Sequence, residues 1–133
     1  MYIPLLATLA LSMGTLDCPS SPNCVSSLAS DPARRVEPLR YSENQRELAM
    51  HTLLNLLRNL PRTEIVHEET TIIQAVVSSA LFRFKDDLEF HFDPKVPLIH
   101  LRSASRTGHW DLGVNRNRIE RLRKDFDQQM QNT

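Results

Sequence analysis

The spacing of apolar residues predicts a helix in the first half of the chain. Between residues 42 and 61 apolar side chains recur at helical spacing, with polar side chains on the other faces. Ser42, followed three positions later by Gln45, forms the pattern of a capping box, and Pro61 ends the repeat. The stripe expected to face a core consists of Ala49, Leu53, Leu56, Leu57 and Leu60.

From residue 63 to residue 102 the apolar period changes to two, which is typical of strands. Residues 63–68 and 70–79 are rich in β-branched side chains, and residues 82–84 and 88–92 alternate apolar with polar positions. We expect a turn at residues 85–87, a second turn bracketed by Pro94 and Pro97, and a return strand over residues 98–102. Short strands in succession predict an antiparallel meander.

A second amphipathic helix is expected to close the chain, from about Val114 to Gln128. The fold class predicted is therefore α+β: a single domain with an antiparallel sheet of about four strands and an N-terminal and a C-terminal helix packed on it. The chain divides into an apolar leader (1–14), an extended segment rich in Cys, Pro and Ser (15–41) and an α+β body (42–130). The buried stripe of the last helix consists of Ile119, Leu122, Phe126 and Met130.

Composition excludes several classes of protein. The 133 residues include 16 Lys and Arg against 16 Asp and Glu, so the chain is not a generally basic nucleic-acid binder. The three glycines form neither a dinucleotide-binding nor a P-loop motif. The charge is uneven, because residues 62–101 carry an excess of acidic side chains and residues 102–133 an excess of basic ones. These two regions are expected to be matched surfaces of one fold.

The first 13 residues are apolar and uncharged. They are too short to span about 30 Å of hydrocarbon but have the size of the apolar region of a signal peptide. The chain is therefore expected to be exported, periplasmic or lumenal, and residues 1–13 could tether it to a membrane. A buried N-terminal strand or helix is the alternative.

The two cysteines, Cys18 and Cys24, lie six positions apart with Pro19 and Pro22 between them. Two cysteines alone make a poor metal site. In an exported protein a short disulfide loop is expected. A nucleophilic cysteine is the less favoured alternative, since no base is identifiable beside either thiol.

The most unusual stretch, residues 102–118, separates the last expected strand from the last expected helix. It holds two of the three glycines and the only tryptophan, together with four arginines near a helix N-terminus, where backbone N–H groups and the helix dipole favour an anion. The alternative is that these arginines pair with acids and brace the loop. The candidate ligand-binding residues are Arg102, Ser103, Ser105, Arg106, Asp111, Asn115, Arg116 and Arg118.

Catalytic, metal and nucleic-acid sites have weaker support. Asp86 and Asp87 are paired carboxylates, but in a continuous strand they would point to opposite faces. His91 and His100 are expected to face each other across a hairpin, and two histidines do not make a zinc site. We predict no metal and no cofactor. Residues 102–124 lack a set of aromatic residues for stacking bases, which argues against nucleic acid as a partner.

Four motifs, CPSSPNCVSS (18–27), FRFKDDLEF (82–90), RSASRTG (102–108) and DLGVNR (111–116), resemble domain-of-unknown-function family 1499. The resemblance covers roughly residues 18–126. Members of that family often follow a signal, transit or membrane segment, in bacteria and in photosynthetic eukaryotes, which implies export here. The resemblance carries no activity over to this chain.

Three functional hypotheses follow. The first is a non-catalytic exported or lumenal domain that binds an anionic ligand or a protein partner through the loop from Arg102 to Arg118. The second is an enzyme of unassigned chemistry that uses the same loop with Asp86 and Asp87. The third is a structural envelope or thylakoid accessory protein in which the loop is only a brace.

Overall fold

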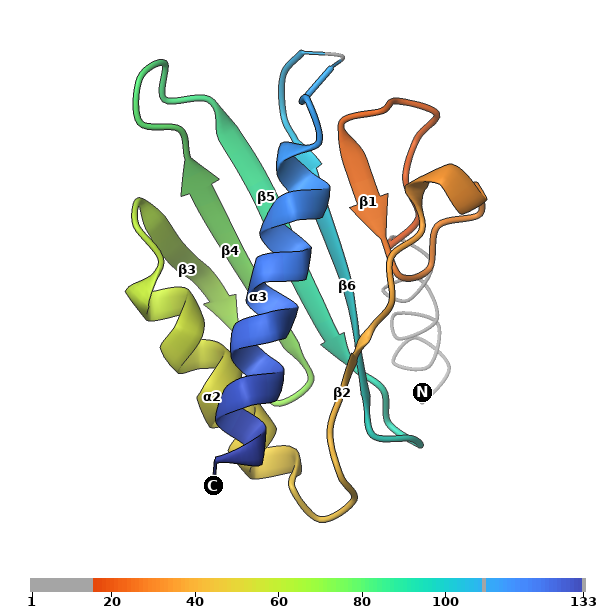
Figure 1. The fold of residues 1–133 in the computed structure, drawn as a ribbon, viewed down its shortest axis with the longest axis vertical. Coiled ribbons are helices and arrows are strands. Elements are labelled where there is room, and N and C mark those ends of the chain that lie inside the picture. The colour runs from red at the N-terminus through yellow and green to blue at the C-terminus, as the bar shows by residue number, and fades with distance from the viewer. Residues whose placement is uncertain (1–15, 109, 133) are drawn as a thin grey trace, which may run out of the picture.

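The computed structural model describes residues 16–108 and 110–132 and shows one α+β domain (Figure 1). The apolar leader predicted over residues 1–14 lies outside the described residues. In chain order the elements are β1 (Cys24–Ser26), the 3-10 helix η1 (Pro32–Arg34), β2 (Leu39–Arg40), α2 (Arg46–Asn59), β3 (Thr63–Glu68), β4 (Ile72–Ser78), β5 (Lys85–Phe92), β6 (Leu98–Ser105) and α3 (Val114–Gln131).

The sheet is antiparallel throughout and has the strand order β1-β6-β5-β4-β3, with β2 also paired to β6. The two short strands β1 and β2 lie along the same edge of β6, where β1 pairs with residues 102–104 and β2 with residues 98–99. The meander predicted from residue 63 onward is confirmed as β3 to β6. The sheet has six strands rather than about four.

The core lies between one face of the sheet and the two helices, which lie in front of the sheet in Figure 1. Because side chains alternate between the two faces along each strand, apolar residues of neighbouring strands lie next to one another on this face. For example, Ile73 pairs with Phe90, and Phe90 pairs with Leu101. Burial of these side chains and of the two helical stripes supplies the main driving force for folding. The fully buried side chains of the helices include Leu53, Leu57, Ile119 and Phe126.

Helix α2 begins later than the capping box predicts. Asn44 has a left-handed backbone (φ 70°), and Gln45 N donates to Ser42 O at 3.1 Å, so residues 42–45 form a turn. Gln45 stands at the N-cap position without a side-chain cap. The prediction that Ser42 opens the helix is therefore wrong, because a left-handed residue cannot continue a right-handed helix.

The turn between β4 and β5 also lies outside its predicted position. Ser79 N donates to Phe84 O at 2.8 Å, and Phe84 N donates to Ser79 Oγ at 2.9 Å, so the chain reverses over residues 79–84. Asp86 and Asp87 therefore belong to β5 and not to a turn. Arg83 supplies the left-handed conformation (φ 57°) that glycine or asparagine usually provides in a turn, and this left no turn signal in the sequence.

The segment before α2, predicted as an extended segment, contributes three residues to the hydrophobic core. Val25 and Leu39 are buried on the core side, and Val36 between them is buried as well. Leu39 pairs with Ile99, and Val25 pairs with Ser103. The two short strands account for the difference between the predicted and the observed number of strands.

Candidate functional site: the junction between β6 and α3

The loop between β6 and α3 is held by Asp111, whose carboxylate occupies the N-terminus of the helix. Its oxygens accept from Gly113 N at 2.9 Å, from Asn115 N at 3.1 Å and from Asn115 Nδ2 at 2.8 Å. Burial alone would raise the pKa of Asp111, but these hydrogen bonds outweigh burial and hold the pKa below its usual value. The chain thus supplies its own anion at the place where the sequence suggested a bound one.

Asn115 is the centre of the polar network beneath this junction, and its side chain is fully buried. The two hydrogens of the amide nitrogen Nδ2 serve three acceptors, because Asn23 O at 3.2 Å and Ser105 Oγ at 2.9 Å lie within reach in addition to Asp111, so one N–H is shared. The amide oxygen accepts from Ser103 Oγ at 2.6 Å. One amide therefore connects the last strand, the loop and the segment that begins β1.

Arg118 extends the network to β5. Its guanidinium donates to Asp86 at 2.7 Å, to Asn115 Oδ1 at 2.9 Å and to Ser103 Oγ at 3.1 Å. The side chains of Arg118 and Asp86 are only 15% and 13% exposed, so the ion pair is largely desolvated. Such a pair is costly to break, because the remaining partner is left as an uncompensated charge.

The other three arginines of the candidate set lie elsewhere. Arg106 forms a two-pronged ion pair with Asp87 at 2.8 and 2.9 Å, at the surface. Arg102 points to the opposite face of the sheet, where Nη1 donates to Asp17 O at 3.1 Å and Nη2 lies 3.9 Å from Glu89. Arg116 reaches η1 and donates to the carbonyl oxygens of residues 33 and 35 at 2.9 and 3.2 Å.

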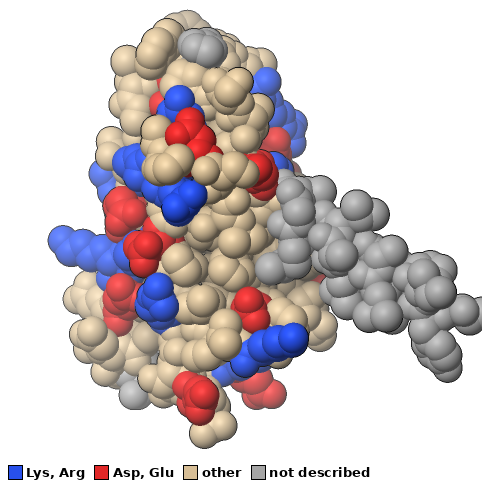
Figure 2. All heavy atoms as spheres, turned by 90° about the vertical axis from the view of Figure 1, so that its right-hand side faces the viewer, with Lys and Arg blue, Asp and Glu red and all other residues tan. Residues whose placement is uncertain are grey.

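Of the eight candidate residues, the structure brings together Ser103, Ser105, Asp111, Asn115 and Arg118. The division of the set follows from strand alternation, because residues 103 and 105 face the helices while residue 102 faces away. The same alternation puts Asp86 and Asp87 on opposite faces of the sheet, as expected. Figure 2 shows basic and acidic side chains intermingled on the side of β1 and β2, whereas the upper end in that view carries few charges.

A cavity of about 300 Å³ opens beside the junction, between η1 and the loop. Arg34 and Arg116 supply positive charge to its lining, and the carboxylate of Asp111, which is hydrogen-bonded to Gly113 and Asn115, also lies in the lining. Within the described part of the chain, no carboxylate lies within 4.0 Å of the Arg116 guanidinium, and Arg34 Nε is 4.0 Å from Asp31. The apolar residues of the lining are Pro22, Val25, Ala33, Trp110 and Leu112.

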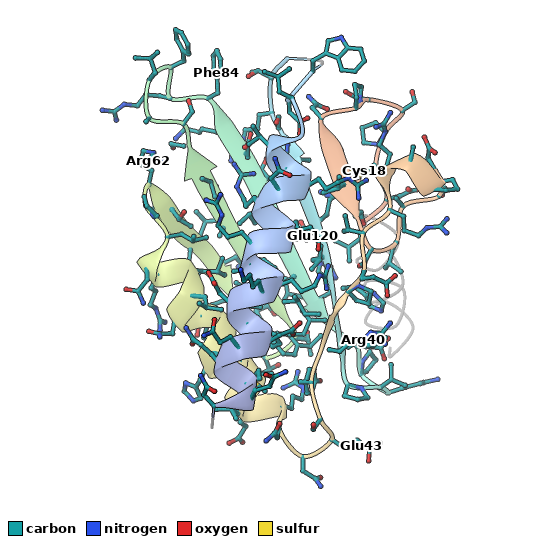
Figure 3. All side chains as sticks on the ribbon, in the orientation of Figure 1. Cys18, Arg40, Glu43, Arg62, Phe84 and Glu120 are labelled. Atoms are coloured by element: carbon teal, nitrogen blue, oxygen red, sulfur yellow. A yellow bond between two sulfur atoms is a disulfide. The ribbon has the colours of Figure 1, made fainter. Side chains whose placement is uncertain are left out.

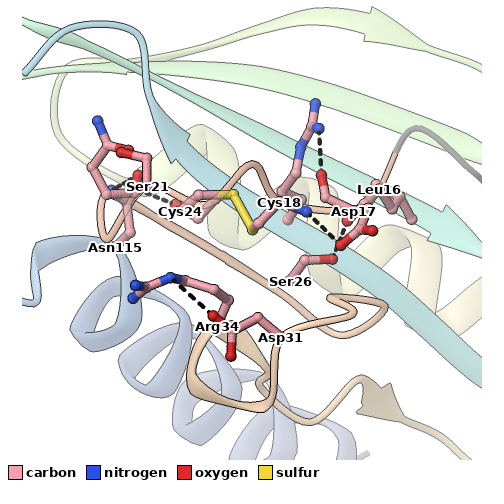
Figure 4. The surroundings of a disulfide bond; sticks show 12 residues. Leu16, Asp17, Cys18, Ser21, Cys24, Ser26, Asp31, Arg34 and Asn115 are labelled. Atoms are coloured by element: carbon pink, nitrogen blue, oxygen red, sulfur yellow. Dashed lines mark hydrogen bonds and ion pairs between the residues drawn. A yellow bond between two sulfur atoms is a disulfide. The ribbon is translucent and has the colours of Figure 1, made fainter. Parts of the chain in front are cut away.

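Cys18 and Cys24 form a disulfide, as predicted, and its loop is attached to the junction (Figure 4). Asn23 Nδ2 donates to Gly108 O at 2.5 Å, and Ser105 N donates to Asn23 O at 3.0 Å. On the other side of the loop, Asp17 accepts from the N–H and the hydroxyl of Ser30, which lowers its pKa. Structural disulfides of this kind are typical of oxidising compartments.

The opposite face of the sheet carries a second polar cluster, centred on Glu89, that was not among the predicted site residues. His91 Nε2 lies 2.9 Å from Glu89 Oε2, and Gln74 donates to Glu89 Oε1 at 3.0 Å. The hydrogen bond with His91 is the main cause that holds the pKa of Glu89 below its usual value, against the effect of burial. The alternation of Glu89 and His91 with buried phenylalanines was the signal available, since it puts both on the face away from the helices.

His91 and His100 lie opposite each other on β5 and β6, as expected. His100 Nε2 lies 3.3 Å from Asp93, and His100 Nδ1 lies 3.4 Å from Ser27 Oγ. Ser27 Oγ also accepts from Leu101 N at 2.9 Å, so the hydroxyl fastens the chain to β6. Across residues 16–108 and 110–132, no three His, Cys, Asp or Glu side chains are grouped to hold a metal ion.

Glu89 gives the domain a pH-dependent contribution to stability. The folded-state pKa is lowered, so the contribution is present above the unfolded-state value of about 4.5 and is lost as the pH falls through the folded-state pKa. We expect Glu89→Gln to lower the free energy of unfolding by about 1–2 kcal/mol at neutral pH. Below pH of about 4 the difference should shrink, because a protonated glutamate resembles glutamine.

Urea unfolding followed by circular dichroism at the two pH values measures this difference. Glu64→Gln, at an exposed position of β3, is the matched control and should change little at either pH. A deficit of Glu89→Gln that stays the same at both pH values would contradict the assignment.

These features define a small α+β domain in which a disulfide loop and a C-terminal helix are joined through a buried polar network to the end of one strand. The chain belongs to the DUF1499 family: the family model described as "Protein of unknown function (DUF1499)" matches residues 16–126. This match confirms the family resemblance seen in the sequence. Neither the curated proteins nor the solved structures give a match to the chain. No helix in the described part of the chain is long and apolar enough to cross a membrane.

Proposed function

We propose that this domain is a non-catalytic binding module of an exported or lumenal protein, and that it holds a small anionic ligand in the cavity between η1 and the loop before α3. The disulfide between Cys18 and Cys24 supports export, because such bonds persist in oxidising compartments. The predicted apolar leader supports the same location.

The observation that carries the proposal is the set of partners of the Arg116 guanidinium. Its guanidinium is oriented by the carbonyl oxygens of residues 33 and 35 and not by a carboxylate, so its charge is not neutralised by an ion pair among the described residues. An anion in the cavity would meet that charge and the charge of Arg34, while the carboxylate of Asp111 in the lining already accepts hydrogen bonds from Gly113 and Asn115. Arginine binds carboxylates and phosphates through paired N–H donors.

The apolar part of the lining narrows the ligand class. Trp110 and Leu112 line the same cavity as Arg116. A volume of about 300 Å³ is at the small end of ligand sites. The chemistry therefore favours an aryl or alkyl carboxylate or a phosphate ester, and it favours a small molecule over the acidic segment of a protein partner.

The polar network around Asn115 and Arg118 has a different role in this proposal. Its donors and acceptors are bound to one another, so it braces the cavity wall rather than contacting the ligand. This agrees with the structural alternative for that part of the loop. The enzyme alternative is not favoured, because Asp86 and Asp87 lie on opposite faces and each is paired with an arginine.

Native mass spectrometry of the protein purified from its own host tests the proposal. We expect an anionic adduct on the wild-type chain that Arg116→Gln loses, because the substitution removes the charge and the paired donors. Lys124→Gln, an exposed position on the same helix, should keep the adduct. A wild-type spectrum without an adduct, or an adduct that Arg116→Gln retains, would contradict the proposal.

A further inference from the structure

The turn between β4 and β5 exposes large apolar side chains at one end of the molecule. Leu81 is 80% exposed, Phe82 68% and Phe84 57%. The rings of Phe82 and Phe84 stack on each other, with their centroids 5.4 Å apart, so neither is packed into the core. A cluster of exposed apolar residues on a folded domain often marks an interaction surface.

A second loop contributes further exposed apolar residues to the same end of the molecule. The β4–β5 turn and the loop that precedes α3 both project from the upper end in Figure 1, and Phe84 is labelled there in Figure 3. Trp110 is 76% exposed and Leu112 93% exposed. Leu112 (φ 54°) and Arg83 (φ 57°) hold left-handed conformations that bulky residues rarely adopt. We call Leu81, Phe82, Phe84, Trp110 and Leu112 together the apolar tip.

Positive charge lies directly beneath the turn. A cavity of about 390 Å³ is lined by Arg62, Arg83 and Lys85, and Glu64 is the acidic residue in its lining. Within the described residues, none of the three cations has a carboxylate within 4.0 Å. Arg62 Nε donates to the carbonyl oxygen of Ser78 at 3.0 Å, and Lys85 Nζ donates to the hydroxyl of the same residue at 3.4 Å. By contrast, Arg106 and Arg118 are fully engaged with aspartates.

We infer that this end of the domain docks on a bilayer that contains anionic phospholipids. The apolar tip enters the interface between headgroups and acyl chains, and Arg62, Arg83 and Lys85 contact the phosphates. Aromatic residues and cationic side chains with apolar stems are the residues that favour this zone. The tip consists of side chains that protrude from two separate loops, which a fluid interface accommodates without the shape complementarity that a protein partner requires.

Co-sedimentation of the full chain with lipid vesicles tests the inference. One set of vesicles is phosphatidylcholine alone, and the other is an equimolar mixture with phosphatidylglycerol. We expect binding to the mixed vesicles that weakens at high salt, because screening reduces the attraction of the cations. The double variants Phe82→Ser/Phe84→Ser and Arg83→Glu/Lys85→Glu should each bind at least about tenfold more weakly.

Matched controls come from the turn at the other end of β5. Val96 is 45% exposed and follows Lys95, so Val96→Ser and Lys95→Glu make the same kinds of change away from the tip. Both should bind vesicles as the wild type does. Residues 1–15 are common to every variant, so any difference measures the tip. Because the substituted side chains are exposed, the circular dichroism spectrum and the midpoint of thermal unfolding should stay at their wild-type values.

Three outcomes would overturn the inference. They are a wild-type chain that does not sediment with the mixed vesicles, tip variants that bind as well as the controls, and a loss confined to Arg83→Glu/Lys85→Glu that inorganic phosphate reproduces by competition. The third outcome would assign the cavity to a soluble phosphate compound. None of these results depends on the adduct test for Arg116, so the two proposals stand or fall separately.

Discussion

Replacing Arg118 by methionine is expected to lower the free energy of unfolding by about 3–5 kcal/mol. Asp86 would remain as a carboxylate that is only 13% exposed and has lost its partner at 2.7 Å. Ser103 Oγ and Asn115 Oδ1 would lose a charged donor in the same step. Urea unfolding monitored by circular dichroism at neutral pH measures the loss.

Two comparisons separate loss of the ion pair from a general effect on α3. Arg121→Met, at an exposed position one turn along the helix, should cost less than about 0.5 kcal/mol. Adding Asp86→Leu to Arg118→Met should recover much of the loss, because the buried charge is then removed together with its partner. If Arg118→Met is no less stable than Arg121→Met, the ion pair between Arg118 and Asp86 contributes nothing to the stability of the domain.

Asn115→Ala is expected to cost about 2–4 kcal/mol. The amide is fully buried and accepts hydrogen bonds from Ser103 and Arg118, and its two N–H groups are shared among Asn23, Ser105 and Asp111. Alanine would leave the buried hydroxyl groups of Ser103 and Ser105 and the carbonyl oxygen of Asn23 without this partner. The same urea titration measures the effect.

Asn115→Asp tests whether hydrogen bonding rather than shape is responsible. Aspartate has the same shape but cannot donate, and it would stand beside the carboxylate of Asp111. It should destabilise at least as much as alanine does. Asn117→Ala, on the exposed side of the same helix, should be close to neutral. Tolerance of Asn115→Asp would mean that the donated hydrogen bonds do not matter.

The sequence predicted the elements that rest on periodicity. Residues 63–68 form a strand and the last helix begins at Val114, as expected, because one repeated face packs against the core in each. It did not predict β1 and β2, since strands of three and two residues are too short to show a period and exist only because β6 lies beside them. The starting point of α2 was missed because it depends on the left-handed Asn44 rather than on composition.

The same distinction applies to the candidate site: its local features could be predicted from the sequence, and the contacts that depend on the fold could not. The sequence located the loop before α3 from its glycines and polar residues, and it recognised that acids could pair with the arginines. It could not indicate that Asp111 would occupy the helix N-terminus, since that depends on the path of the loop. Nor could it indicate that Arg34 would share a cavity with Arg116, because residues so far apart in sequence meet only when η1 packs beside α3.

The edges of the sheet decide whether neighbouring copies of the chain can pair their strands. One edge of the sheet is formed by β1 and β2, strands of only three and two residues that offer little length for pairing, and the other edge is formed by β3. That edge is irregular: the register shifts between Ile65 and His67, and Glu64, His67 and Glu68 are exposed along it. A bulged and charged edge is a poor template for an added strand. Many copies held side by side on one surface would therefore remain separate molecules rather than growing into a continuous sheet.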